Sequence, residues 1–435
     1  MKKLLVLTLA VALVIAFTLP ASAFESVFGG YWRTRFITEQ QFSGMKNSNA
    51  DESPNDLQQV DTRTRLYYTA VLNDNLKLVN KFEWNNTWGS GPGGDYGADG
   101  TGIIRIKQSY VDANIGPVRA KIGQHDATFA RGFIYADEFS GITLSFKMGD
   151  VLVPFIWMKG NEGGGNHNSN DVDIFALFPV FQLGEKMTLN PYIIYGYSKA
   201  SNHVGGQDSL STYGANGFDR ADANDGVNVY WLGADFDATL GSVGLWATAV
   251  YNGGKVKTDT PGVDNGDVKA YLLAGGASVP IGPVELHGQA FYASGDGSEN
   301  DNDLEAFFGI GGGGRGCAYY WSEIMGNGVF DEQISAGSTV DVSNLWAANI
   351  GASIKPVEKL KLTGDIWYAA HPKNDFTTDE KKLGTEVDLR ADYQLVEGLN
   401  LTVVGAYLFA DDATSLDGNN DEDPYEVGAQ LSLSF

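Results

Sequence analysis

Charged side chains recur at every second position in several neighbouring segments, with apolar side chains between them. In the early segments the charges are mainly basic, and the set is Arg33, Arg35, Arg63, Arg65, Lys81, Arg105, Lys107, Arg119 and Lys121. In later segments they are mainly acidic, and the set is Asp235, Asp237, Glu285, Asp365, Glu386, Asp388 and Asp392. A β-strand projects alternate side chains to opposite faces, so each set is expected on one face of a sheet.

Two facing arcs of opposite charge would set up an electric field across a water-filled lumen. Such a field filters ions by sign and orients a dipolar or zwitterionic solute. The sequence therefore predicts a pore-lining basic arc opposite a pore-lining acidic arc. The alternative is that the polar lumen positions of any barrel collect charges without a selective role.

Residues with catalytic chemistry form no recognisable motif in the sequence. The five histidines are scattered at 125, 167, 203, 287 and 371, and no pair has the spacing of a metal site. Cys317 is the single cysteine, so it forms no haem-attachment motif and no intramolecular disulfide. The run Gly311 to Gly314 is not followed by Lys and Ser or Thr, so it is no phosphate loop. We therefore expect no enzyme, no catalytic residues, no bound metal and no cofactor.

The alternation that places these charges predicts about eighteen strands. An even number suits a single-chain bacterial barrel whose two ends lie on the same side of the membrane. The expected strands are 26–38, 58–73, 76–88, 102–115, 117–126, 138–148, 151–161, 170–182, 187–200, 227–240, 243–254, 268–280, 283–294, 343–355, 359–371, 384–396, 398–410 and 424–435.

Every second connection between the expected strands is a tight turn rich in Gly, Asn and Asp. The tight turns are 73–75, 116–117, 149–150, 184–186, 241–242, 281–282, 356–358 and 397–398. The intervening connections include long acidic loops such as 39–57, 201–226, 255–267, 295–342 and 411–423. Short periplasmic turns and long extracellular loops are typical of outer-membrane barrels. The chain is thus predicted to be all-β, a single closed antiparallel transmembrane β-barrel.

The ends of the chain agree with that fold. Leu4 to Leu19 is the only long apolar run, and Ala21-Ser22-Ala23 fits a cleavage site, so residues 1–23 are predicted to be a signal peptide. The barrel is then expected over 24–435. The last strand alternates and ends on an aromatic residue. Its residues Tyr425, Leu431, Leu433 and Phe435 resemble the signal that the barrel-assembly machinery reads. A soluble antiparallel sandwich would also alternate, but it would not need this ending.

The loop 295–342 begins acidic and then turns apolar, with Phe307, Phe308 and Trp321 among its residues. An apolar loop beside a wet pore should bury itself, so we expect it to fold inward or to cap the mouth and narrow the channel. The alternative is a lid packed on its own aromatic residues outside the pore. Acidic residues crowd 296–303 and 411–423, where oxygen ligands could hold Ca²⁺, although plain solvated acidity explains them too.

Several short stretches resemble a known family. Lys121-Ile122-Gly123-Gln124-His125, followed by Gly132 to Tyr135 and Phe139 to Ile142, resembles the "Gly-Arg-Gln … Phe-Asp-Gly" stretch of alginate-export-like outer-membrane porins. Arg63 to Trp88 is similar to the second hairpin of porins from anaerobic and sulfur-metabolising bacteria. The resemblance implies an eighteen-stranded diffusion channel. Gly123 passes directly to Gln124 with no Arg between them, and the loops are acidic, so alginate itself is not expected as the solute.

The function that these patterns favour is a passive porin for small hydrophilic or ionic solutes in the outer membrane of a Gram-negative bacterium. Its expected partners are outer-membrane lipid and lipopolysaccharide. A monomer and a homo-oligomer are both compatible with the sequence. A net charge of −24 argues against nucleic acid as a partner. One alternative is a barrel that sheathes an electron-transfer protein and conducts no solute. Another is an outer-membrane hydrolase, which would need Ser and His clustered at the outer rim.

Overall fold

The computed structural model describes residues 24–42, 56–90, 104–162, 171–198, 226–257, 264–297, 303–310, 319–330, 342–374, 380–414 and 422–435. The predicted signal peptide lies outside these residues. The strands are β1 Glu25–Gln40, β2 Leu57–Asn73, β3 Leu76–Thr87, β4 Arg105–Ile115, β5 Val118–Phe129, β6 Tyr135–Met148, β7 Val151–Asn161, β8 Val172–Leu177, β9 Phe181–Gln182, β10 Met187–Ser198, β11 Gly226–Leu240, β12 Val243–Lys257, β13 Gly266–Ile281, β14 Val284–Ala293, β15 Leu345–Val357, β16 Leu360–Ala370, β17 Lys382–Val396, β18 Leu399–Ala410 and β19 Tyr425–Ser434. Two short 3₁₀ turns, η1 Ala130–Gly132 and η3 Asp412–Thr414, lie in connections. No helix of the described residues is long and apolar enough to cross a membrane.

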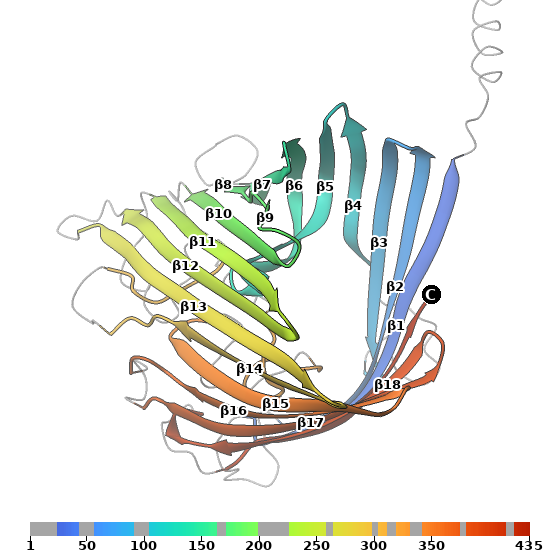
Figure 1. Ribbon diagram of the computed structural model, residues 1–435, viewed down its shortest axis with the longest axis vertical. Helices are drawn as coiled ribbons and strands as arrows, with labels where there is room; N and C mark the ends of the chain where they lie inside the picture. The colour runs from blue at the N-terminus through green and yellow to red at the C-terminus, as the bar shows by residue number, and fades with distance from the viewer. Residues whose placement is uncertain are drawn as a thin grey trace, which may run out of the picture.

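The strands close into a ring. Successive strands pair antiparallel, except that β8 and β9 do not pair with each other. β1 pairs with both β2 and β19, so that Arg35 lies opposite Asp61 on one side and Gln430 on the other. Figure 1 shows the strands following one another around the ring until the C-terminus lies beside β1. In the described residues the β1–β19 pairing joins the first and last strands, so neither of them is left as an open edge of the sheet. The predicted closed antiparallel barrel is confirmed.

One expected strand is interrupted. The stretch 170–182 forms β8 and β9, and both pair with β10, so they share one position in the wall. Pro179 lies in the gap, and proline has no N–H with which to continue a strand ladder. The sheet has 19 strands, and subtracting one for the shared position gives the expected eighteen crossings.

The tight turns form where the sequence places them. Gly116, Gly149 and Gly241 occupy them with φ of 60°, 62° and 66°, a left-handed conformation that glycine adopts without steric cost. A short turn with positive φ matches the twist of the two strands that it joins. The local sequence therefore fixes these hairpins.

Neighbouring residues of the wall have opposite environments. In β11 the side chain of Leu232 is 43% exposed, whereas that of Trp231 is 0% exposed. The Trp231 indole N–H donates to the carbonyl of Phe308, in the loop 295–342, with 2.9 Å between nitrogen and oxygen. The even position of this pair thus faces outward, and the odd position faces the interior.

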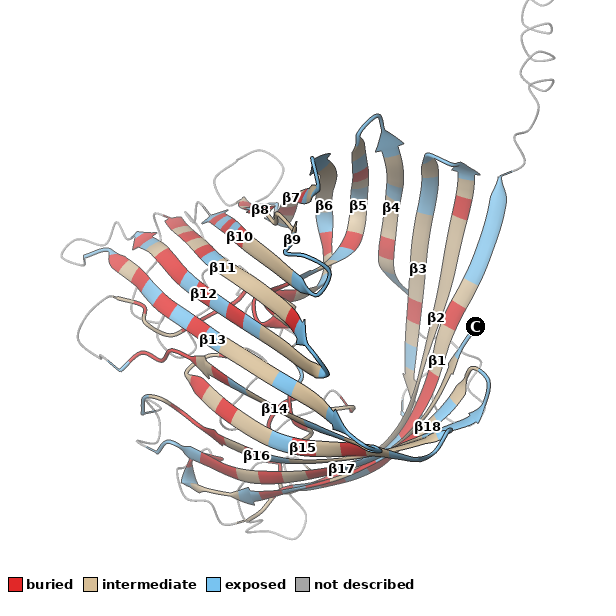
Figure 2. Ribbon diagram, in the orientation of Figure 1, coloured by how far each residue is buried: buried red, intermediate tan, exposed pale blue. Residues whose placement is uncertain are grey.

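The interior contains an apolar core as well as charges. Figure 2 shows buried residues spaced along β10–β13. Inward-facing Ile194, Val229 and Leu272 are almost fully buried, and they belong to one cluster with Phe133, before β6, and Phe307, in the loop 295–342. The sequence predicts a barrel with a water-filled lumen. That expectation is wrong for this part of the interior, because connecting segments fold in and cover apolar side chains.

Candidate functional site

The strands β1–β3, which carry several of the predicted basic residues, also carry acidic residues that pair with them. In the register of β1–β3, Arg35 donates from Nε to both carboxylate oxygens of Asp61 at 3.0 Å. Arg65 contacts Glu83 at 2.7 Å, and the Nε of Arg63 lies 3.7 Å from the same carboxylate. Cross-strand pairs of opposite charge hold the long side chains against the wall. These arginines therefore form a mixed ladder with carboxylates and not a purely basic arc.

The other members of the predicted basic arc have varied surroundings. Arg119 pairs with Asp112 at 2.6 Å, and Lys81 and Lys121 lie over the rings of Tyr67 and Tyr110. Lys107 pairs with Glu138 and lies 3.7 Å from Asp137. Arg33 is buried, with a relative exposure of 7%, and Arg105 is exposed.

The register of β3 and β4 shifts between the pairs of Lys81 and Phe82. Simple alternation therefore no longer fixes the face of Lys107. Asp112 was missed as a member of the wall, although the alternation of Tyr110, Asp112 and Asn114 with apolar residues in the sequence signals it.

Most acidic residues predicted for the opposite arc are also engaged. Asp235 accepts from Thr248 Oγ1 at 2.7 Å, and Asp392 accepts from Arg390 and Thr402. Asp365 accepts from Asn349 at 2.6 Å and lies 2.9 Å from the Nε2 of His287. Glu285 is exposed.

Glu386 and Asp388 differ from the expectation of water-facing carboxylates. Their relative exposures are 0% and 7%, because the loop segment 319–330 covers them. Glu386 accepts from the backbone N–H groups of Ile324 at 2.7 Å and Met325 at 2.9 Å, and from Ser322 Oγ at 3.0 Å. The sequence shows on which face these carboxylates lie but not what covers that face.

The loop 295–342 reaches several parts of the wall. Leu304 forms a parallel bridge with Val268 in β13, and Ile310 N donates to Ile134 O at 2.7 Å. The Tyr319 hydroxyl donates to Gln289 at 2.6 Å. At the far end of the described segment, Phe330 packs beside Ile37 and Val404, and its carbonyl accepts from Arg35. These contacts run from β13 to β1, so the described parts of the loop lie inside the barrel.

A second inward segment was not predicted. The turn η1 joins β5 and β6, and both Ala130 and Arg131 have positive φ, of 49° and 58°. Such a conformation in residues other than glycine is strained and persists where surrounding contacts hold it. Arg131 donates to Asp237 at 2.8 Å and to Thr248 at 3.0 Å, and its guanidinium lies 5.0 Å from the ring centroid of Trp246. No sequence motif marks Arg131.

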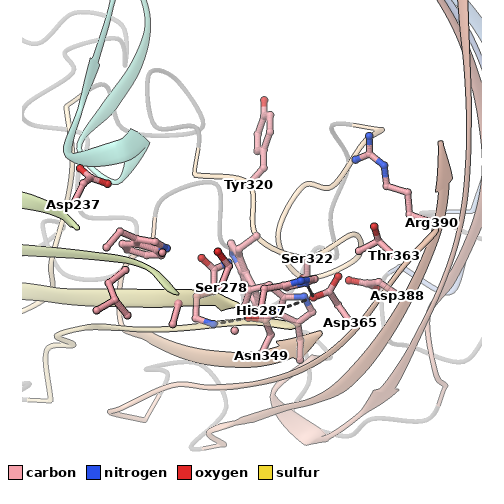
Figure 3. Close-up of a pocket in the computed structure, with 18 of the residues that line it drawn as sticks. Asp237, Ser278, His287, Tyr320, Ser322, Asn349, Thr363, Asp365, Asp388 and Arg390 are labelled. Carbon is pink, nitrogen blue, oxygen red and sulfur yellow. Dashed lines mark hydrogen bonds and ion pairs between the residues drawn. The ribbon is translucent and has the colours of Figure 1, made fainter. Parts of the chain in front are cut away.

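The loop segment 319–330 borders a cavity of about 1060 Å³ against the acidic wall. Its lining includes His287, Asp365 and Arg390 from the strands and Tyr320 and Glu323 from the loop. Figure 3 shows His287, Asn349 and Asp365 grouped below Ser322, with Asp388 beside them and Tyr320 pointing away from this group. The cavity therefore has an acidic floor and an aromatic side chain at its edge.

Burial perturbs the titration of the loop residues themselves. Burial is the largest influence on Glu323 and raises the pKa of its carboxyl, while the N–H of Val329, which donates to it at 2.6 Å, and Arg390 oppose that rise. Burial also raises the pKa of the Tyr319 hydroxyl well above its usual range. Glu323 is thus more readily protonated than an exposed glutamate.

The Ca²⁺ sites and the assembly signal stay predictions. Four of the ten acidic residues in 296–303 and 411–423 lie outside the described residues, namely Glu299, Asp301, Asp417 and Asp421. Of those described, Asp303 pairs with Lys269 and Asp423 accepts from Tyr407. No group of three or more His, Cys, Asp or Glu in the described ranges could hold a metal. Phe435 exchanges backbone hydrogen bonds with Gly30 and so closes the barrel.

Comparison with known proteins identifies the fold but no sequence family. No family model matches the chain, and no curated protein matches it. The solved structure of Pseudomonas aeruginosa OpdK with vanillate has a TM-score of 0.59 at 11% identity, and the match covers 94% of this chain and 98% of that chain. OccK9 (OpdG) from the same organism has a TM-score of 0.58 at 12% identity, with 94% and 99% covered. The outer membrane protein OprD, also from that organism, gives 0.53 at 10% identity, with 94% and 93% covered.

These structures correct the resemblance drawn from the sequence. They are outer-membrane porins of the OprD and Occ type, a family distinct from the alginate-export-like porins. The chain therefore shares the barrel fold of outer-membrane porins, and the finer attribution to the alginate-export-like family is not supported.

Proposed function

We propose that the protein is a passive diffusion channel for small hydrophilic or ionic solutes in the outer membrane of a Gram-negative bacterium. The observation that carries the proposal is a closed barrel whose charged residues share one face of the wall. Arg63, Arg65 and Glu83 lie together on β2 and β3, opposite in direction to the exposed Ile106 and Ile122 of the neighbouring strands.

The cost of burying charge in lipid fixes which face is inside. A basic residue on the lipid face costs about 2–4 kcal/mol at the bilayer midplane. Arg33, Arg35, Arg63 and Arg65 together would make an outward orientation prohibitive. In an aqueous interior Arg63 and Arg65 stay partly exposed to water and keep Glu83 as a partner, so a water-filled passage along this wall explains their positions.

The loop and the two charged walls would give the channel its selectivity. The described segments of the loop 295–342 contact β11, β14 and β17, so solutes would pass along the ladder of β1–β3. Arg35 and Phe330 touch, so the loop reaches this ladder. A solute would therefore pass between paired charges on one side and the loop on the other, and its dipole would be oriented there.

The test is a measurement of single-channel conductance of the purified, folded protein in planar bilayers. We expect ohmic steps in simple salts, and partial block by solutes that enter the passage. The solute panel should include amino acids, sugars and vanillate, which is the compound present with OpdK. Heat-unfolded protein from the same preparation is the control. Absence of steps from the folded protein would refute the proposal.

The structure offers no support for the alternative of a sleeve around an electron-transfer protein. A sleeve needs an open interior that admits a partner. Here the apolar cluster around Phe307 and Trp321 fills part of the interior with the chain's own residues.

A further inference from the structure

We propose that Glu386 and Asp388 are positioning residues, which hold the loop segment 319–330 inside the barrel and thereby set the width of the passage. The inference rests on the proposed channel function but goes beyond it. The two carboxylates of β17 would hold the loop and would not select ions by charge.

The geometry resembles a socket for an anion, formed by the loop around the strand. Both Glu386 oxygens accept from the loop, with Ile324 N on one and Met325 N and Ser322 Oγ on the other. The preceding amide, Glu323 N, approaches Asp388 Oδ2 at 3.4 Å. Successive backbone N–H groups that converge in this way form an anion-binding concavity. Three consecutive amides of the loop are thus turned toward two carboxylates of one strand.

A carboxylate is the side chain that this socket requires. Glu386 is fully buried, and a buried charge is tolerated when several hydrogen bonds compensate its lost hydration. A glutamine side chain has one acceptor oxygen and an NH₂ group, which would point a donor at a loop donor. The loop and Glu386 therefore depend on each other: without the loop the charge is uncompensated, and without the charge the amides are unsatisfied.

Packing on both sides of the socket locates the segment further. Trp321 meets Trp367 of β16 edge to face, with 5.1 Å between ring centroids. Phe330 lies against Gly428 of β19, where any side chain would collide with the Phe330 ring. The absence of a Cβ at Gly428 thus makes room for the far end of the segment. The carboxylates fix the middle of the segment, and these aromatic contacts fix its ends.

The test is Glu386→Gln in the full-length protein. The loss of one charge-assisted hydrogen bond corresponds to roughly a tenfold or larger change in an equilibrium constant, so the fraction of time in a wider state should rise by about that factor. We expect larger conductance steps, a higher size limit in polymer-exclusion measurements, and protease cleavage within 319–330 in detergent. Glu397→Gln is the matched control, because it makes the same chemical change at an exposed residue in the turn directly after the same strand.

A second variant tests the proposal if Glu386→Gln does not fold. Trp321→Ala changes only the loop side, and it should move the same three measurements in the same direction. The proposal is overturned if folded Glu386→Gln, or Trp321→Ala where the former does not fold, matches the wild type in all three. If the wild type itself conducts nothing, the channel function fails, but protease cleavage of the variants still decides whether the carboxylates hold the loop.

Discussion

Replacing Arg63 and Arg65 by glutamine should make the channel more selective for cations. Both arginines contact Glu83, at 3.7 Å and 2.7 Å, so the wild-type group of three side chains carries one net positive charge. The double variant carries one net negative charge at the same place. Arg63→Glu with Arg65→Glu would shift selectivity further in the same direction, but it would crowd three carboxylates together, so the glutamine pair is the cleaner perturbation.

The size of the effect follows from Coulomb's law in a wet lumen. A unit charge at about 7 Å in water interacts with a passing ion by about 0.6 kcal/mol, and salt near 0.1 M reduces this to roughly half. Removing two charges thus changes the energy of each ion by about 0.6 kcal/mol, with opposite signs for cation and anion. The cation-to-anion permeability ratio should therefore rise by roughly five- to tenfold.

The assay is the reversal potential of the channel in a salt gradient. Glu83→Gln provides the opposite test, because it frees two arginines from their shared partner and should shift the reversal potential toward anions by about half as much. Lys255→Gln removes a charge from an exposed side chain that pairs with Asp267 and should leave the potential unchanged. If the arginine and Glu83 variants both leave the reversal potential unchanged, this wall does not face the conducting path.

Three further outcomes are expected. Burial raises the pKa of the Glu323 carboxyl, so the neutral form of this side chain stabilises the loop in its position inside the barrel at acidic pH, and this stabilisation is lost as the pH rises through the raised pKa. The single-channel conductance should therefore fall on acidification. Glu323→Gln should remove this pH dependence. Arg131→Ala loses the contacts to Asp237 and Trp246, worth about 2 kcal/mol, and should increase current noise in single-channel records as the β5–β6 turn is released. Gly30→Val puts a side chain where the Phe435 ring lies and should lower the folded fraction seen as a heat-modifiable gel band, whereas Gly405→Ala, with open space around it, should not.

The wall of the barrel could be predicted from the sequence because its determinants are local. The period of two in Tyr425 to Phe435 shows which side chains share a face, and it needs no knowledge of the partner strand. The glycines of the tight turns act through their own φ angles. Even the interruption at Pro179 has a local cause, since that residue lacks the N–H of a strand ladder.

The contents of the barrel were decided by tertiary structure alone. Alternation places Glu386 on the inner face, but the donors that cover it come from residues about sixty positions earlier in the chain, in a segment without periodicity. Arg131 gains its role only when the turn after β5 reaches Asp237 across the intervening strands. A strand pattern specifies the direction of a side chain, whereas its partner depends on how a long loop closes through space, and that closure is set by the packing and hydrogen bonds it gains at the far end.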